Sequence, residues 1–185
     1  MHPVILASSS PRRKELLQFL QIPFQTVNAN VDETIAAGTT PEEAVKQLAY
    51  RKAAEVNRSH KGSIIIGSDT VVAIEGDILG KPAGRDDARA TLKRLSGKAH
   101  SVYTGVAIIK DEYSKIFAEK TEVTFWELSD EEIEKYLDSG EPYDKAGSYG
   151  IQGLGSLLVK SIAGDYYTVV GLPVSRLARE IKAFI

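Results

Sequence analysis

Short apolar runs alternate along the chain with segments whose apolar residues recur at helical spacing, and this alternation limits the available folds more than any other feature. The apolar runs, rich in β-branched residues, predict strands at residues 4–7, 63–67, 71–74, 102–109 and 121–126. Helical spacing predicts helices at residues 11–20, 41–57, 85–95, 130–137 and 173–184. Strands that alternate with helices predict an α/β protein with a mixed sheet.

The chain has 185 residues, enough for one sizeable core or for two lobes that share a sheet. It contains no linker rich in Ser, Gly or Pro and no repeat at a fixed period, so we expect a single domain over residues 1–185. Composition shifts only at GEPYDKAGSYGIQGLG, residues 140–155, where five glycines separate polar and aromatic residues. This pattern is typical of a structured loop with polar content.

Composition excludes several classes of function. A net charge of −2 supplies no overall field that would hold DNA or RNA, and the absence of cysteine excludes disulfides, zinc thiolates and thiol catalysis. The first apolar run ends at Ala7, too early for a signal sequence or a membrane span, so we expect a cytoplasmic protein without a membrane partner. The three histidines show no ligand spacing, and no G-x-S-x-G nucleophile motif occurs.

The stretch LASSSPRRKELL, residues 6–17, places cations where a helix disfavours them. Ser10 and Pro11 suit the N-cap and the first position of a helix, and Arg12, Arg13 and Lys14 then fall in its first turn. The helix that begins at Pro41 follows the usual rule, because Thr40 followed by Glu42 and Glu43 matches a capping box with acidic residues in that turn. A bound polyphosphate would explain the cations, with the hydroxyls of residues 8–10 beside them; the alternative is a capped helix with solvated basic residues.

Asp69 lies between two apolar runs in IIIGSDTVVAI, residues 64–74, and we expect it at the end of a central strand. A carboxylate there is costly to bury unless its charge is used. It could hold Mg²⁺ or take a proton from an attacking water, or it could cap its own backbone in a turn. The adjacent Thr70 could orient a substrate or serve as an ordinary strand residue.

For two lysines and one glutamate, the sequence likewise leaves two interpretations of the role. Lys52 continues the apolar stripe of its helix, so it either extends past the edge of the core into solvent or reaches a phosphate. Lys81 follows glycine in GDILGKP, which lacks the spacing and the hydroxyl of a P-loop. Contact between Lys81 and an anion is still an alternative. Glu33 is by default a solvated loop acid, with metal binding as the less favoured alternative.

Several long motifs occur together and in order: LASSSPRRKELL, GSDTVV, GKP, RLSGKAHSVYTGV, EPYDKAGSYGIQGLG and GDYYTVVGLP. Over nearly its whole length the chain resembles the Maf family of nucleoside triphosphate pyrophosphatases, and its 145–155 segment resembles the subgroup that acts on dTTP and UTP. The resemblance implies an elongated mixed sheet flanked by helices, with a nucleotide-binding cleft between two lobes, as in inosine triphosphatases. It also implies a homodimer, a requirement for Mg²⁺ or Mn²⁺, and a connection with arrest of septum formation.

The family's functional positions can be transferred residue by residue. The resemblance makes Asp69 the catalytic proton acceptor and, with Glu33, a metal ligand. Substrate-binding positions fall on Ser8, Arg12, Arg13, Lys52, Thr70, Lys81 and Gln152, of which Arg12, Thr70 and Gln152 are implied to set specificity. The Gln152 carboxamide offers an acceptor and donors that complement N3–H and a carbonyl of uracil or thymine.

These expectations combine into one function: hydrolysis of dTTP and UTP to the monophosphate and pyrophosphate, which removes unwanted nucleotides from the pool. Activity on modified uridine triphosphates is left open. Two alternatives remain, a nucleotide-binding regulator of cell division without turnover and a purine-selective hydrolase of the inosine triphosphatase type. Nucleic-acid binding ranks last, because the net charge is slightly negative and no aromatic platform is interleaved with basic residues.

Overall fold

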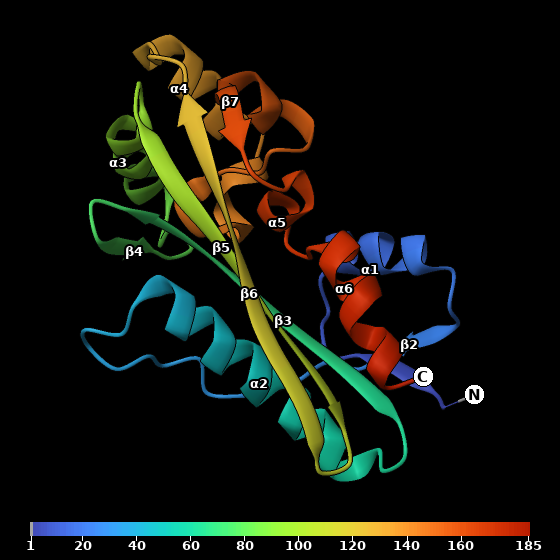
Figure 1. Ribbon diagram of the computed structural model, residues 1–185. Helices are drawn as coiled ribbons and strands as arrows, with labels where there is room; N and C mark the ends of the chain where they lie inside the picture. The colour runs from blue at the N-terminus through green and yellow to red at the C-terminus, as the bar shows by residue number, and fades with distance from the viewer. Residues whose placement is uncertain (1) are drawn as a thin grey trace. The chain divides into compact units, whose positions relative to one another are not determined.

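The computed structural model describes residues 2–185 and confirms the α/β class with a mixed sheet. The strand order is β2-β1-β3-β5-β6-β7, and β4 pairs with β3 (Figure 1). β1 runs parallel to β2 and β3, whereas β3–β4 and β6–β7 are antiparallel. The strands are β1 Val4–Leu6, β2 Phe24–Thr26, β3 Ile64–Ile74, β4 Asp77–Leu79, β5 Ala99–Lys110, β6 Tyr113–Phe125 and β7 Val159–Ala163.

The predicted helices are present with small shifts at their ends. The α-helices are α1 Pro11–Leu17, α2 Pro41–Ser59, α3 Arg85–Leu95, α4 Asp130–Asp138, α5 Tyr166–Val170 and α6 Val174–Glu180. Short 3-10 turns extend or connect them: η1 Gln18–Leu20, η2 Glu141–Asp144, η3 Ala146–Ser148, η4 Gly153–Leu158 and η5 Ile181–Ala183. Ser10 caps α1 as predicted, and Thr40 with Glu43 forms the predicted capping box of α2.

Several features of the fold differ from the sequence-based expectation, and the short strands β2, β4 and β7 were not predicted at all. Residues 63–67 and 71–74 belong to the single strand β3, and β6 begins at Tyr113 instead of 121. The early part of β6 was missed because most of its side chains are exposed and it contains no apolar run longer than three residues. The helix α5 was missed because its YYTVV sequence is β-branched and aromatic, which favours a strand.

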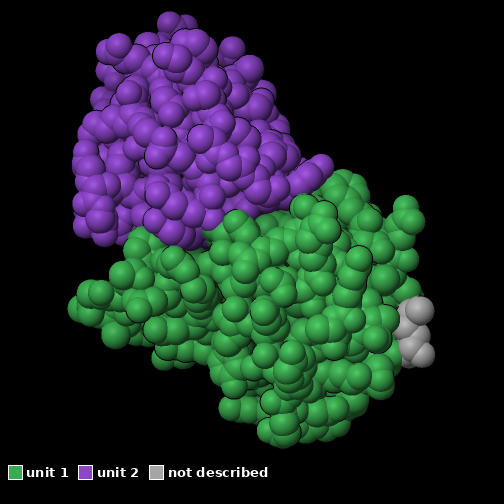
Figure 2. All heavy atoms as spheres, in the orientation of Figure 1, with its two compact units in different colours: residues 1–69, 104–119, 171–185 green, residues 70–103, 120–170 purple. Residues whose placement is uncertain are grey.

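The chain divides into two compact units, which Figure 2 distinguishes by colour. Unit 1 comprises residues 1–69, 104–119 and 171–185, and unit 2 comprises residues 70–103 and 120–170. Each unit has a core of its own. In unit 1, alanines of α2 pack on Ile5, Ile65 and Ala107 of the sheet. In unit 2, the apolar faces of α3 and α4 pack on Val72, Val102 and Phe125.

Two glycines allow α2 to lie unusually close to the sheet in unit 1. A Cβ atom on Gly67 of β3 would lie 2.2 Å from the carbonyl oxygen of Ala49, and one on Gly105 of β5 would lie 2.3 Å from that of Val45. Any side chain at these positions would therefore push the helix outward. This close packing of α2 against β3 and β5 (Figure 1) brings Lys52 to the strand that carries Asp69.

An ion-pair network joins α3 to α4 in unit 2. Glu134 of α4 accepts hydrogen bonds from Arg89 and Arg85, and these bonds lower the pKa of Glu134 to about 2. The carboxylate therefore stays ionised over the whole range in which the protein is expected to work. Because these groups are substantially exposed, the network orients the two helices more than it stabilises them.

Candidate functional site

Lys52 is the centre of a charged cluster in unit 1. Its Nζ lies 2.6 Å from Oδ1 of Asp69 and 2.8 Å from Oε1 of Glu33. The Lys52 side chain is 13% exposed and that of Asp69 is 12% exposed, so this pair is largely removed from water. The lysine on the apolar stripe of α2 is thus held by two carboxylates instead of ending in solvent. One acid of the cluster comes from a strand and the other from a loop.

Asp69 lies in the middle of β3, which corrects the prediction that it ends a strand and excludes the alternative of a turn. The polar residues that interrupt the apolar run are satisfied by partners from elsewhere in unit 1. The Ser68 hydroxyl donates to the carbonyl oxygen of Gly171 at 3.1 Å, and Asp69 is paired with Lys52. Because the partners supply these bonds, the strand continues through a polar stretch that would otherwise break it.

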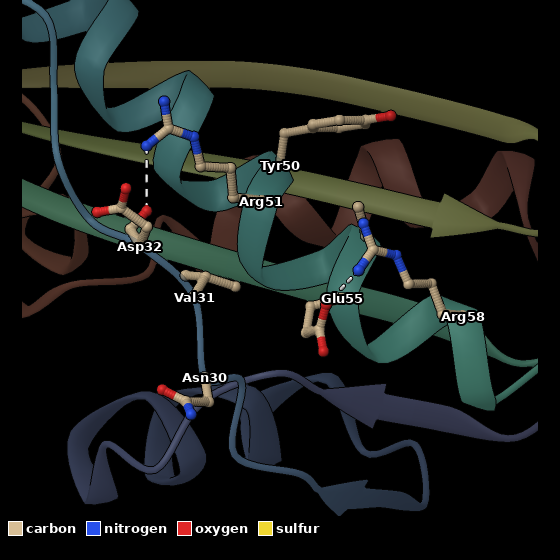
Figure 3. A pocket seen from close by; sticks show the side chains of 8 residues that line it. Asn30, Val31, Asp32, Tyr50, Arg51, Glu55 and Arg58 are labelled. Carbon is tan, nitrogen blue, oxygen red and sulfur yellow. Dashed lines mark hydrogen bonds and ion pairs between the residues drawn. The ribbon is translucent and has the colours of Figure 1, made fainter.

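Arg51 holds the backbone of the loop that carries Glu33. The Arg51 guanidinium donates to the carbonyl oxygens of Asp32 at 3.1 Å and Thr34 at 2.7 Å, the two residues that flank Glu33 (Figure 3 shows the bond to Asp32). The Asp32 carboxylate accepts a hydrogen bond from the Thr34 N–H at 2.8 Å, which closes the turn. The Thr34 side chain and then this N–H lower the pKa of Asp32. Glu33 is therefore presented to Lys52 by an ordered turn.

The arginine at the start of α1 belongs to the same charged environment. Arg13 is half-buried, and its Nε donates to the carbonyl oxygen of Gly171 at 2.9 Å. Burial lowers the pKa of the Arg13 guanidinium, while the Asp69 carboxylate opposes this shift, Arg12 adds to it and Glu33 opposes it. These interactions place Arg13 within electrostatic reach of both acids and of the second arginine.

The serine loop before α1 is ordered by its own hydroxyls. Ser8 is buried, and its Oγ accepts a hydrogen bond from the Ser10 N–H at 3.2 Å. Ser10 in turn accepts from the Arg13 N–H at 3.5 Å. The loop thus sets the point from which the half-buried Arg12 and Arg13 leave the backbone. Unit 1 thereby brings together six of the predicted residues: Ser8, Arg12, Arg13, Glu33, Lys52 and Asp69.

The other three predicted residues belong to unit 2. Thr70 is the next residue of β3 after Asp69, whereas Lys81 and Gln152 are exposed in loops. The two loops are joined, because the Gly147 N–H donates to the Gly80 carbonyl oxygen at 3.1 Å. The predicted polar segment 140–155 is ordered by the 3-10 turns η2, η3 and η4.

A surface hollow of about 450 Å³ lies beside the Glu33 loop, between residues 30–32 and the outer face of α2 (Figure 3). It is lined by Tyr50, Arg51, Glu55 and Arg58 among others, and none of the predicted site residues faces it. Arg58 is 78% exposed and pairs with Glu55 of its own helix. The hollow is therefore separate from the cluster of Lys52, Glu33 and Asp69.

The pair of acids suits a hard divalent cation. Glu33 and Asp69 both form ion pairs with one cation, the Lys52 ammonium, so the two carboxylates can bind a shared positive charge. Within residues 2–185 no three His, Asp or Glu side chains gather into a site that would hold a metal by itself. Mg²⁺ commonly uses one or two carboxylates together with substrate phosphates, so two acids fit such an ion.

Two contributors to the cluster were missed in the sequence. Arg51 has no motif that marks it, since it is one of several charged residues on α2. The carbonyl group of Gly171 accepts from both Arg13 and Ser68, and this glycine has a φ of 127°, a conformation that other residues rarely adopt. The GLP sequence at residues 171–173 could have indicated a special backbone position, although not the partners of its carbonyl.

None of the helices described in residues 2–185 combines the length and apolar character needed to cross a bilayer. Among solved structures, the fold is similar to that of a HAM1 protein from Coxiella burnetii, with a TM-score of 0.52 and 14% identity. The match covers 99% of this chain and 100% of that one, and at such low identity it concerns the fold alone.

Close relatives occur among curated proteins. A Bacillus cereus protein named dTTP/UTP pyrophosphatase is 55% identical over 184 residues, which is 100% of this chain and 96% of that protein. A Bacillus mycoides protein of the same name is 54% identical with the same coverage. A family model described as Maf-like protein matches residues 3–184, and the chain therefore belongs to the Maf family.

Proposed function

We propose that this chain hydrolyses dTTP and UTP to the nucleoside monophosphate and pyrophosphate. The observation that carries the proposal is the Lys52 ammonium bound to both Glu33 and Asp69, with Arg13 in electrostatic reach of the acids. Hydrolysis of a triphosphate needs cations for the phosphate charge and an acid for the water, and unit 1 contains both. The names of relatives that are more than half identical support the same reaction.

The cations of unit 1 bind the triphosphate. Arg12 and Arg13 offer guanidinium groups that suit phosphate oxygens, and Gly171 restricts the orientation of Arg13 through its Nε. Lys52 is a compact charge that can shift from a carboxylate to a phosphate oxygen when substrate arrives. The Ser8 hydroxyl lies at the start of this loop and adds a donor.

Asp69 is the catalytic residue in this scheme. Its carboxylate takes a proton from the attacking water, whose oxygen forms a bond to the α-phosphorus. The bond between the α-phosphorus and the bridging oxygen breaks, and the electron pair leaves with pyrophosphate. Lys52 donates to the Asp69 carboxylate and orients it before substrate binds, and most of the rate comes from positioning and charge neutralisation.

Glu33 and Asp69 would hold the divalent cation. When bound, Mg²⁺ or Mn²⁺ neutralises charge on the phosphate oxygens and the leaving group. The ordered turn between Asp32 and Thr34 keeps Glu33 directed at the same place in the absence of the ion.

In unit 2 we assign Thr70, Lys81 and Gln152 to substrate binding. Gln152 is exposed at the middle of its loop, and its carboxamide can pair with N3–H and a carbonyl of uracil or thymine. Cytosine reverses this pattern, with an acceptor at N3 and an amino group at C4, so an amide held in the orientation that suits uracil would pair poorly with it, at a cost of about 1–3 kcal/mol. Lys81 adds a cation for the phosphates, and Thr70 adds a hydroxyl beside Asp69 in the sequence.

The test is a panel of nucleoside triphosphates incubated with the protein and Mg²⁺ or Mn²⁺, followed by identification of the products. The proposal expects monophosphate and pyrophosphate from dTTP and UTP. A lack of turnover with every nucleotide would favour a regulator that only binds them, and preferred turnover of ITP would favour a purine-selective enzyme. Release of inorganic phosphate in place of pyrophosphate would contradict attack at the α-phosphorus.

We also propose a homodimer that works in the cytoplasm, where its nucleotide substrates are present. Sedimentation velocity at several protein concentrations tests the dimer. A monomer at all concentrations would contradict it. A connection with septum arrest stays a prediction, which an inactive variant expressed in cells would separate from catalysis.

A further inference from the structure

The segment 150–155, here called the Gln152 loop, is held at both ends by side chains that precede it in the sequence. At its start, the Gly150 N–H donates to the Tyr136 hydroxyl at 3.2 Å. At its end, Glu141 accepts hydrogen bonds from the N–H groups of Leu154 at 3.0 Å and Gly155 at 3.2 Å, one on each carboxylate oxygen. Tyr136 belongs to α4 and Glu141 begins η2, so two successive elements hold one short loop.

The loop is closed so tightly that its glycines have no room for a side chain. A Cβ atom on Gly153 would lie 2.6 Å from Oε1 of Glu141, and one on Gly155 would lie 1.9 Å from the Gly150 carbonyl oxygen. Gly153 also has a φ of 64°. The glycines therefore let the backbone approach the Glu141 carboxylate and close on itself.

Glu141 and Tyr136, the two residues that hold the loop, are themselves held in place. Lys145 donates to the backbone carbonyl oxygen of Glu141 at 2.7 Å. The Tyr136 ring is buried in the core of unit 2. Burial is the main reason that the pKa of Tyr136 is raised, so its hydroxyl stays protonated and available to the loop.

Gln152 lies between the two anchored ends, with extended backbone angles and an exposed side chain. Its carboxamide makes no hydrogen bond to the described part of the chain, so the loop backbone is what the chain itself uses to position this side chain. A residue that selects a base by two hydrogen bonds needs a fixed backbone, because any mobility must be lost when substrate binds.

We propose that Glu141 and Tyr136 are positioning residues for base selection, holding the Gln152 loop so that its carboxamide meets the pyrimidine edge. This inference rests on the proposed function and deepens it, since it names residues that act through Gln152 without contacting substrate. A carboxylate accepts both N–H groups at once, whereas an amide of the same shape has one acceptor oxygen and would leave one N–H facing a donor.

The first measurement tests the anchoring itself, by amide hydrogen exchange of the wild type and of two isosteric variants. Glu141→Gln should accelerate exchange at Leu154 and Gly155, and Tyr136→Phe should do so at Gly150, by about tenfold or more. Glu127→Gln and Tyr143→Phe are matched controls, because Glu127 is exposed and the Tyr143 hydroxyl donates to Leu137 instead of the loop. Unchanged exchange in both test variants would overturn the proposal.

The second measurement is the ratio of kcat/KM for UTP to that for CTP. Glu141→Gln should lower this ratio by about tenfold, which corresponds to the free energy of about one hydrogen bond. The control variants should keep the ratio of the wild type. In a chain that already carries Gln152→Ala, Glu141→Gln should lower the ratio no further, because both changes act on the same contact. Additive losses, or an unchanged ratio in Glu141→Gln alone, would overturn the proposal.

Tyr136→Phe keeps the buried ring, so it tests the same coupling should Glu141→Gln fail to fold. Failure of the proposed function is visible separately, because it would appear in the wild type as an absence of monophosphate and pyrophosphate. Failure of the positioning role would appear only in the variants, as a UTP to CTP ratio that does not change when Glu141 or Tyr136 is replaced.

Discussion

The Lys52 ammonium lies 2.6 Å from the Asp69 carboxylate in a place where both side chains are nearly out of water. A buried ion pair of this kind contributes little net stability, because desolvation of the two charges offsets most of their attraction. In the proposed function the pair places the catalytic carboxylate next to a cation that can bind phosphate. The two residues come from different elements, α2 and β3, whose separation is set by Gly67.

Asp69→Asn should abolish pyrophosphate release while leaving the fold intact. The amide has nearly the same shape but cannot take a proton from water, so kcat should fall by about 10²- to 10⁴-fold. Product assays with dTTP and thermal unfolding of the same sample check both parts. Asp130→Asn, at an exposed ion pair on α4, is the control that should keep full activity. Activity of the Asp69 variant near that of the wild type would remove this residue from the mechanism.

Lys52→Met should make the protein less stable in the absence of divalent ions and more responsive to Mg²⁺. Without the ammonium, two carboxylates face each other, which we expect to cost about 2 kcal/mol given their partial exposure. A divalent cation can replace the missing charge, so Mg²⁺ should raise Tm more in the variant than in the wild type. Lys93→Met, which removes an exposed ion pair with Asp130, serves for comparison. Equal Mg²⁺ responses in all three proteins would argue against a cation between Glu33 and Asp69.

Arg51→Gln should weaken activity through the loop that presents Glu33. It removes the bonds to the carbonyl oxygens of Asp32 and Thr34, so the turn loosens and Glu33 is held less firmly. We expect activity or metal affinity to fall by about 10- to 100-fold, measured as kcat over a series of Mg²⁺ concentrations. Arg58→Gln, on the same helix, should have no such effect, because Arg58 pairs with Glu55. Matching metal titrations for the two variants would refute the role of Arg51.

Gly67→Ala should destabilise unit 1 and displace Lys52. The new Cβ would lie 2.2 Å from the Ala49 carbonyl oxygen, so α2 must move away from β3. We expect a loss of about 1–3 kcal/mol or more in urea unfolding, together with a large loss of activity. Gly80→Ala is the matched change, since no atom beyond its two chain neighbours lies within 4 Å of the position that its new methyl group would take. A Gly67 variant as stable as the Gly80 variant would contradict the close packing of α2 on the sheet.

Stability should fall as the pH is lowered from 6.5 toward 4, in part because of His100. Burial against Phe125 and Tyr149 lowers the pKa of His100 from 6.5 to about 4. Between these two values the unfolded chain binds a proton that the folded chain does not, so the free energy of unfolding decreases as the pH falls. The contribution is at most about 3 kcal/mol. Urea unfolding at several pH values should show a flatter profile for His100→Gln, and an unchanged profile would exclude His100 as the cause.

Much of the site was predictable because its residues break local rules. Arg12 and Arg13 stand at the wrong end of a helix, Asp69 interrupts an apolar run, and Lys52 occupies an apolar stripe. Each violation is visible in the sequence, since it concerns neighbours along the chain. The resemblance to a family then gave each residue an expected role. The N-caps Ser10 and Thr40 were predictable for the same reason, because a cap depends only on residues close by in the sequence.

Other features depended on partners that are distant in sequence. Periodicity could not show that β3 continues through Asp69, because the strand is maintained there by Lys52 and by the carbonyl of Gly171. It also could not show that Arg51 orders the Glu33 turn or that Glu141 and Tyr136 hold the Gln152 loop.

The sequence by itself thus determined which residues carry charge where a chain normally avoids it, and hence the class of chemistry. Only the tertiary structure decided which of these charges meet and what holds them in place. The physical reason is that a propensity or a cap acts over a few residues, whereas a buried charge needs a partner that the fold alone can deliver.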